Sequence, residues 1–167
     1  MFSRQITSAE KYTIIMDNPS DTIKATSDSA TVTSDNTEFL ASLQPDAFDA
    51  VIVAGGDFPT HPVPLAVMER ARMLVACDSA GEELVRRGYK PTVIVGDCDS
   101  MSAEFRAKHA DIIYKVEEQD YNDLTKATRF CTERGCRRIA YVGATGKRDD
   151  HTLGNISRLD VYPPPLH

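Results

Sequence analysis

The 167-residue chain contains no tryptophan, and aromatic residues make up only 7% of it. No apolar stretch approaches the roughly 18 residues that a membrane-spanning helix needs. Residues 1–10 also lack the apolar run of a secretory signal. From these absences we expect a cytoplasmic protein that makes no contact with a membrane.

A cluster of basic residues is also missing. The formal net charge is -6 at pH 7, and no cluster of lysine and arginine is longer than three residues. Proteins that bind nucleic acid usually carry a basic face, so we expect no nucleic-acid partner. The acidic balance does not exclude an anionic substrate, because a bound divalent cation reverses the local electric field.

The cysteines do not form the C-x-x-C pairs that are typical of zinc sites. There are four of them, Cys77, Cys98, Cys131 and Cys136. Thiols stay reduced in the cytosol, so a disulfide framework is not expected either. We interpret all four as small side chains that are buried or half-buried.

The composition of the chain changes near residue 46. Residues 20–37 are mainly Ser, Thr and Asp, and such a segment buries little apolar area to offset its ordering entropy. We interpret residues 1–46 as a polar extension, and the composition favours loose packing over an edge strand or a partner contact. The isolated apolar residues that would support such a strand are Ile14, Ile15, Ile23 and Val32. Residues 47–160 then form one folded domain, and residues 161–167, which contain a triple proline, form a tail.

Short apolar runs recur after residue 46 and are continuous rather than alternating. Strands that are covered on both faces have this pattern. The runs lie at 51–53, 73–76, 93–95, 112–114 and 139–142. Helical patterns lie between several of them, at 80–87, 102–109 and 122–134. Alternating strands and helices predict a Rossmann-like, three-layer α/β domain with a mainly parallel sheet.

Glycine and aspartate gather in the loops that follow these runs. In parallel sheets, ligands bind beyond the carboxyl ends of the strands, where such loops meet. The loops lie at 54–57, 77–80, 96–100, 118–123 and 143–151. We therefore expect the chemistry of the protein at this edge of the sheet.

Asp97 and Asp99 are two residues apart, directly after a predicted strand and a glycine. In an extended segment both carboxylates point the same way and can face one Mg²⁺ ion, which prefers oxygen ligands. The alternative is a turn in which Asp97 caps the helix that begins near Ser102. The surrounding V-I-V-G-D-C-D-S favours the metal site.

Three further features admit two interpretations each. Asp123 and Lys126 lie one helical turn apart, either facing a phosphate or serving as ordinary residues at a helix start. Asp78 is either a site residue or the N-cap of the helix at 80–87. Residues 143–148, G-A-T-G-K-R, form either a phosphate loop without the full Walker A pattern or a glycine turn with a charged rim.

Taken in order, five motifs resemble the thiamine pyrophosphokinase family over residues 50–157. They are A-G-G-D-F-P at 54–59, C-D-S-A at 77–80, G-D-C-D-S at 96–100, Q-D-Y-N-D-L-T-K-A at 119–127 and G-A-T-G-K-R-D-D-H-T-L-G-N at 143–155. The resemblance implies an enzyme, a thiamine diphosphokinase. It would transfer pyrophosphate from ATP to thiamine with Mg²⁺, giving thiamine diphosphate and AMP, as a cytoplasmic homodimer.

The resemblance also implies roles for individual residues. The magnesium-binding carboxylates are Asp97, Asp99 and Asp123, which with Asp150 form the expected catalytic set. The residues expected to bind the nucleotide are Gly55, Gly56, Asp78, Gln119, Lys126, Thr145, Gly146 and Arg148.

Two departures from the family pattern qualify these expectations. Glu82 stands where the family usually has asparagine, and its charge is expected to weaken nucleotide binding. The C-terminal β-rich domain of the family, which helps to bind thiamine across a dimer, is expected to be absent. A module that binds nucleotide and Mg²⁺ with little or no turnover is therefore an alternative, and a metal-dependent phosphohydrolase is a weaker one.

Overall fold

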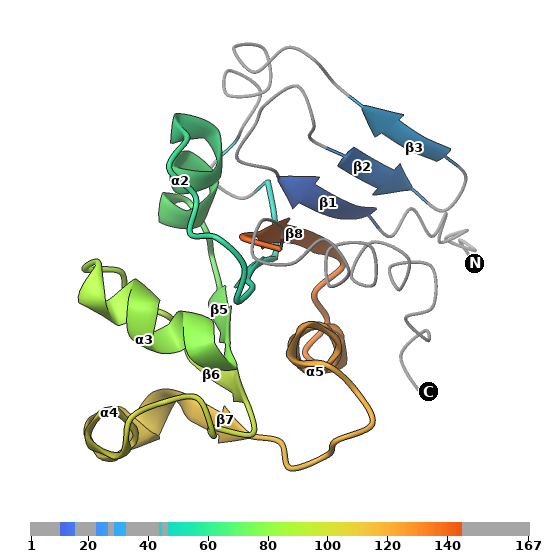
Figure 1. The fold of residues 1–167 in the computed structure, drawn as a ribbon. Coiled ribbons are helices and arrows are strands. Elements are labelled where there is room, and N and C mark those ends of the chain that lie inside the picture. The colour runs from blue at the N-terminus through green and yellow to red at the C-terminus, as the bar shows by residue number, and fades with distance from the viewer. Residues whose placement is uncertain (1–10, 16–22, 27–28, 33–43, 45–46, 145–167) are drawn as a thin grey trace, which may run out of the picture.

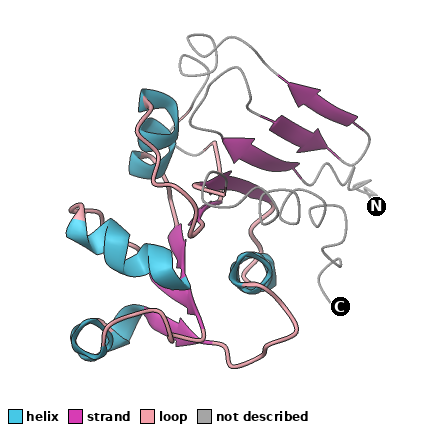
Figure 2. Ribbon diagram, viewed as in Figure 1, coloured by secondary structure: helices cyan, strands magenta, loops and turns pink. Residues whose placement is uncertain are grey.

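The computed structural model describes residues 11–15, 23–26, 29–32, 44 and 47–144. Within these residues the chain forms a sheet of eight strands in the order β3-β2-β1-β8-β4-β5-β6-β7 (Figure 1). Helices cover both faces of its parallel part, as Figure 2 shows in cyan. The predicted three-layer α/β fold with a mainly parallel sheet is confirmed.

The parallel strands correspond to the five apolar runs of the sequence. They are β4 (Ala50–Val53), β5 (Leu74–Cys77), β6 (Val93–Gly96), β7 (Ile113–Lys115) and β8 (Arg138–Val142). Every residue of β4, β5 and β6 is buried. The register keeps their carboxyl ends level, since Val53 lies beside Val142 and Cys77 beside Val95.

Three strands of the N-terminal segment extend the sheet beyond β8. Strand β1 (Lys11–Ile15) pairs parallel to β8, and β2 (Ile23–Thr26) and β3 (Ser29–Val32) follow it antiparallel. Of the two interpretations of residues 1–46, loose packing and edge structure, the described residues show edge strands, and these contain Ile14, Ile15, Ile23 and Val32. Backbone N–H and C=O groups can pair with the open side of β8 whatever the side chains are, and composition does not report this.

Helices α2 (Pro62–Glu69), α3 (Asp78–Arg86) and α4 (Ala103–Lys108) cover one face, and α5 (Asp123–Glu133) covers the other. A short 3₁₀ helix, η2 (Ala110–Ile112), precedes β7. Helix α2 lacks an obvious sequence signal because prolines occupy its first turn, where they are tolerated. His61 caps it, since His61 Nδ1 accepts a hydrogen bond from the Val63 N–H at 3.3 Å. No helix of the described residues is both long and apolar enough to cross a bilayer.

Successive strand residues point to opposite faces, so the sheet separates two apolar cores. The strand residues in the core beneath α5 include Ile52, Val75, Val95, Ile139 and Tyr141. Those in the core beneath α2, α3 and α4 include Val51, Val53, Ala76, Ile94 and Ala140. All four cysteines are free and buried, and burial raises the pKa of each thiol, in line with the packing role expected from the sequence.

Asp49 joins the beginnings of β4 and β8. Its Oδ2 accepts hydrogen bonds from the backbone N–H groups of Arg137 and Arg138, each at 2.8 Å, and its Oδ1 accepts from the Arg138 guanidinium at 3.0 Å. Burial alone would raise the pKa of Asp49, but these hydrogen bonds lower the pKa by more than burial raises it. The pKa therefore lies below its usual 3.8. The carboxylate therefore stabilises the fold fully above pH 3.8, and this contribution is lost as the pH falls through the lower folded-state pKa.

We expect Asp49→Asn to lower the free energy of unfolding by about 1.5–3 kcal/mol at neutral pH, the range for hydrogen bonds to a charged group. The difference from the wild type should shrink below pH 3.8, where the wild-type carboxyl becomes neutral as well. Urea unfolding at a series of pH values from neutral to acidic measures this difference in the free energy of unfolding. Asp111→Asn, in exposed η2, is the control, and a deficit for Asp49→Asn that does not change with pH would contradict this account.

Candidate active site

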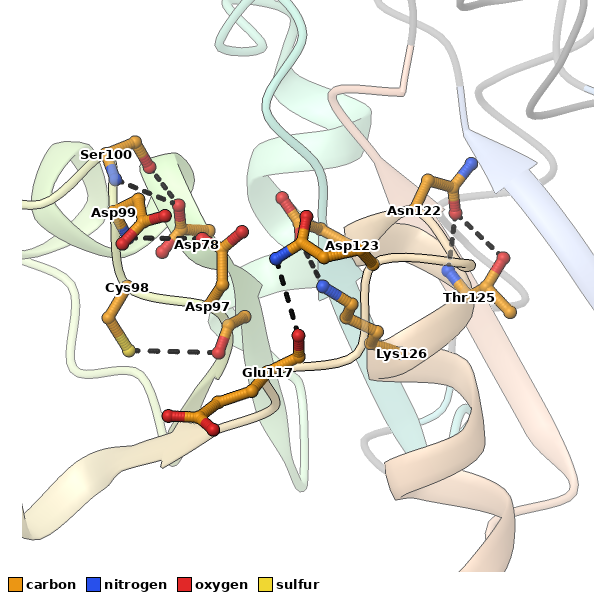
Figure 3. Close-up of polar contacts among 12 residues, drawn as sticks. Asp78, Asp97, Cys98, Asp99, Ser100, Glu117, Asn122, Asp123, Thr125 and Lys126 are labelled. Carbon is orange, nitrogen blue, oxygen red and sulfur yellow. Dashed lines mark hydrogen bonds and ion pairs between the residues drawn. The ribbon is translucent and has the colours of Figure 1, made fainter.

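Three aspartates from separate elements meet at the carboxyl edge of the sheet (Figure 3). Asp78 is the first residue of α3, directly after β5, Asp97 follows β6, and Asp123 is the first residue of α5. Burial raises the pKa of Asp123, the charge of Asp78 raises it further, and Asp97 adds to this effect while Lys126 opposes it. Asp78 and Asp97 therefore lie close enough to Asp123 for their charges to act on it.

Asp78 is 4% exposed, and only one of its two carboxylate oxygens is hydrogen-bonded. Its Oδ2 accepts hydrogen bonds from the Ser100 backbone N–H, at 3.3 Å, and from the Ser100 hydroxyl. Its Oδ1 has no hydrogen-bond partner, and it is the one such buried side-chain atom in the part of the chain that the structure describes. The N-cap of α3 is Cys77, so the interpretation of Asp78 as the cap of this helix is wrong.

Gly96 allows β6 to pass directly beneath Asp78. A Cβ at this position would lie 2.6 Å from Asp78 Cβ and 3.2 Å from Asp78 Cα. Real Cβ atoms do not approach this closely, so any larger residue would push the strand and the start of α3 apart. The glycine of the G-D-C-D-S motif is therefore required by a contact with the residue that follows the neighbouring strand.

The loop after β6 is a tight turn. Asp97 Oδ1 accepts a hydrogen bond from the Asp99 N–H at 3.1 Å, and Cys98 has a φ of 70°, in the left-handed region that side chains rarely adopt. Helix α4 is capped by Ser102, whose hydroxyl accepts from the Phe105 N–H at 3.2 Å. The alternative in which Asp97 caps this helix is therefore wrong, and the carboxylate of Asp97 faces the site.

Asp99 is exposed, and its charge acts on Lys115. Within the described residues, no three acidic, histidine or cysteine side chains converge closely enough to hold a metal ion by themselves. Mg²⁺ usually keeps several waters and takes phosphate oxygens as further ligands, so it does not need such a cage. Binding of Mg²⁺ by Asp97, Asp99 and Asp123 thus stays a prediction.

Asn122 leaves Asp123 and Lys126 available for chemistry, because Asn122 caps α5. Its Oδ1 accepts hydrogen bonds from the N–H and the hydroxyl of Thr125, both at 2.8 Å. Lys126 is buried, and its Nζ lies 3.6 Å from Asp123 Oδ1. A buried ammonium group at the side of three carboxylates is the arrangement that a polyphosphate with a divalent cation would require.

Two further residues singled out from the sequence, Gln119 and Glu82, also lie in the described part of the chain. Gln119 is exposed, and its Nε2 donates to the Glu117 carbonyl at 3.4 Å. Glu82 accepts hydrogen bonds from the N–H and hydroxyl of Ser102, at 3.2 and 3.0 Å, so its carboxylate is engaged by the start of α4. Four predicted residues lie outside the described residues: Thr145, Gly146, Arg148 and Asp150.

A pocket of about 280 Å³ lies between the loop that follows β4 and helix α3. It is lined by Ala54, Gly55, Gly56, Phe58, Ala80, Glu83 and Arg87. The Arg87 guanidinium lies 4.2 Å from the centre of the Phe58 ring and donates to Glu83 Oε1 at 2.6 Å. Gly55 and Gly56 are predicted site residues, whereas the sequence gives no signal for Glu83 and Arg87. A helical pattern does not indicate which face of α3 contacts the loop after β4, about 30 residues earlier in the chain.

The family can now be stated. Residues 65–162 match the family described as "Thiamin pyrophosphokinase, catalytic domain". The chain belongs to this family. Thiamine pyrophosphokinase 1 of Oryza sativa subsp. japonica is 33% identical over 135 residues, covering 66% of this chain and 50% of that protein. Thiamine pyrophosphokinase of Bacillus subtilis is 32% identical over 113 residues, covering 65% and 52%.

Solved structures agree with this assignment to the thiamine pyrophosphokinase family. The thiamin pyrophosphokinase of Geobacillus thermodenitrificans matches with a TM-score of 0.55 and 29% identity, over 69% of this chain and 56% of that one. The yeast enzyme, at 18% identity and a TM-score of 0.57, shows the shared fold. The chain spans 33% to 52% of the length of the first three curated relatives that it matches.

We expect Gly96→Ala to destabilise this thiamine pyrophosphokinase domain by about 1–3 kcal/mol, as overpacking does, and to displace Asp78. The Ser100 amide, which donates to Asp78, should then shift in a ¹H–¹⁵N NMR spectrum. Gly81→Ala is the control. Its Cβ would lie 2.6 Å from the nearest Ile94 side-chain atom, so it crowds the same contact between α3 and β6 without touching Asp78. An unshifted Ser100 amide in Gly96→Ala would be the contrary result.

Proposed function

We propose that the chain catalyses, or carries the catalytic domain for, the Mg²⁺-dependent transfer of pyrophosphate from ATP to thiamine. The observation that carries this proposal is the group of Asp78, Asp97 and Asp123 beside buried Lys126, at the carboxyl edge of a parallel sheet. Membership of the family supplies the reaction class. The proposed enzyme acts in the cytoplasm as a homodimer, as the resemblance to the family implies.

The residues present fit a divalent cation. A buried carboxylate oxygen of Asp78 without a partner, and an Asp123 carboxylate whose pKa is raised by burial and by the charges of Asp78 and Asp97, form an environment that a hard cation stabilises. Asp97, Asp99 and Asp123 would hold it. When bound, Mg²⁺ neutralises the triphosphate and the charge that develops on the leaving phosphate.

Lys126 and the pocket supply the contacts to the nucleotide. The Lys126 ammonium is buried and lies 3.6 Å from Asp123 Oδ1, so it can bind a phosphate oxygen while Asp123 keeps it in place. The pocket beside Gly55 and Gly56 has room for a flat base, and backbone without side chains allows its close approach. Ala80 belongs to this pocket and is two residues from Asp78, so base and phosphates would occupy continuous space.

In the proposed reaction the thiamine hydroxyl oxygen forms a bond to the β-phosphorus of ATP. The bond between that phosphorus and the oxygen bridging to the α-phosphate breaks, and AMP leaves. Asp97 and Asp123 are the candidates to accept the hydroxyl proton. Positioning of the two substrates supplies much of the acceleration.

Product analysis with ATP, Mg²⁺ and thiamine tests this proposal. We expect AMP and thiamine diphosphate in equal amounts, and no AMP when thiamine is omitted. Asp123→Asn should reduce product formation strongly while the far-ultraviolet circular dichroism stays unchanged. Inorganic phosphate without thiamine would instead indicate a phosphohydrolase, and ATP binding without any product would indicate the binding module.

We also expect Lys126→Met to weaken ATP binding about ten- to a hundredfold while AMP binding changes little. The charge of Lys126 should meet the β- and γ-phosphates, and a charge-assisted contact contributes roughly 1.5–3 kcal/mol. Methionine keeps most of the volume of the buried side chain. Lys108→Met, exposed in the last turn of α4, is the control, and equal losses for ATP and AMP would show that Lys126 does not contact the polyphosphate.

A further inference from the structure

Two of the four cysteines meet at the edge of the sheet opposite to the candidate active site. Cys131 lies in the last turn of α5, and Cys136 lies two residues before β8. Helix α5 begins at the carboxyl edge of the sheet and runs back to the edge where β8 begins. Both thiols are therefore remote from the aspartates, although they belong to the apolar core beneath α5.

The turn that ends α5 brings the two thiols together. Gly135, with a φ of 83°, donates its N–H to the Thr132 carbonyl at 3.0 Å, and the Cys136 N–H donates to the Cys131 carbonyl at 3.1 Å. These two bonds form a Schellman motif, in which the residue after the glycine packs against the last turn of the helix. That contact is commonly between apolar side chains. Here both members are cysteines, and a hydrogen bond joins their side chains.

The other two cysteines have no such partner. Cys77 lies in the same core but interacts with Cys131 only through charge. Cys98 lies in the core on the other face, and its Sγ donates to the Gly96 carbonyl at 3.8 Å. Cys131 and Cys136 are thus the one pair of cysteines in direct contact in the described part of the chain, which contains all four.

The two thiols differ in their access to solvent. Cys136 is 8% exposed and Cys131 is 0% exposed, so a small oxidant reaches Cys136 first. Burial raises the pKa of the Cys136 thiol, and the nearby charges of Arg72 and Arg134 offset only part of this rise. A raised pKa leaves little thiolate, so the reaction is slow. The contact with Cys131 decides the product rather than the rate.

We propose that Cys131 and Cys136 form a reversible disulfide when the protein meets a peroxide, and that this bond protects the pair from irreversible oxidation. The Cys136 sulfur attacks one oxygen of hydrogen peroxide, the O–O bond breaks, and Cys136 becomes a sulfenic acid as one water leaves. The Cys131 sulfur then attacks the Cys136 sulfur, and the S–O bond breaks. The hydroxyl leaves with the Cys131 proton as a second water.

The disulfide would replace a contact that the Schellman motif already makes, so the fold has little to change. Without Cys131 beside it, the Cys136 sulfenic acid would be oxidised further to a sulfinic acid, which thiol reductants do not restore. The proposal does not depend on the transfer of pyrophosphate, because neither thiol belongs to the site of that reaction.

Peptide mapping of the 167-residue chain after exposure to hydrogen peroxide tests this proposal. Free thiols are alkylated in denaturant before digestion. Trypsin cleaves after Arg129, Arg134 and Arg137, so the two cysteines fall in separate peptides, 130–134 and 135–137. We expect the chain to lose two of its four free thiols. The two peptides should appear joined, with two hydrogen atoms fewer than the separate peptides, and dithiothreitol should restore both thiols.

Two variants separate the pair from oxidation of cysteines in general. In Cys131→Ala the 135–137 peptide should gain two oxygen atoms as a sulfinic acid, and dithiothreitol should not reverse this. Cys77→Ala is the matched control, because it removes a buried thiol from the same core and should form the same disulfide as the wild type. The mapping of the wild type decides the matter by itself if Cys131→Ala does not fold.

Three results would overturn the proposal. One is a wild type that keeps all four thiols after long exposure to peroxide. Another is a wild type in which Cys136 becomes a sulfinic acid although Cys131 is present. The third is a linkage of Cys131 to Cys77, found as the 130–134 peptide joined to 73–86, or a linkage between two chains.

Discussion

The parallel pairing of β8, β4, β5 and β6 is the constraint on which the rest of the structure depends. These strands are buried on both faces and must pair along their whole length, because unpaired buried backbone groups are costly. Parallel neighbours require crossover connections, and the helices that form them cover the two faces. The consequence for function is that these parallel strands all end at the same edge of the sheet.

This edge gathers negative charge that the described protein does not neutralise by itself. Asp78, Asp97 and Asp123 come from three crossovers, and burial together with the charges of Asp78 and Asp97 raises the pKa of Asp123. Lys126 offsets part of it. Apolar packing on both sides of the sheet provides the rigidity to hold such a group together, and a bound cation with a polyphosphate would supply the missing compensation.

Capping is carried out by neighbouring residues, which leaves the acidic residues to the site. Asn122 caps α5 in place of Asp123, and Ser102 caps α4 in place of Asp97. Ser102 also donates to Glu82, so the glutamate that departs from the family pattern is engaged with α4. The two hydrogen bonds from Ser102 thus explain how the negative charge of Glu82 is accommodated in the fold.

The sequence by itself determined the layered fold, the edge of the sheet that carries the chemistry and the family. Continuous apolar runs, glycines at helix ends and the order of the motifs are local patterns, and they can be interpreted without knowing which distant residues they contact. Only the tertiary structure decided the rest. Ser100 donates hydrogen bonds to Asp78, and Gly96 leaves space for the Asp78 side chain. The pocket at Arg87 and the strands that extend the sheet beyond β8 were likewise visible only in the fold. Each of these depends on residues far apart in the chain that the sheet brings into contact, and no pattern within a single segment encodes such a contact.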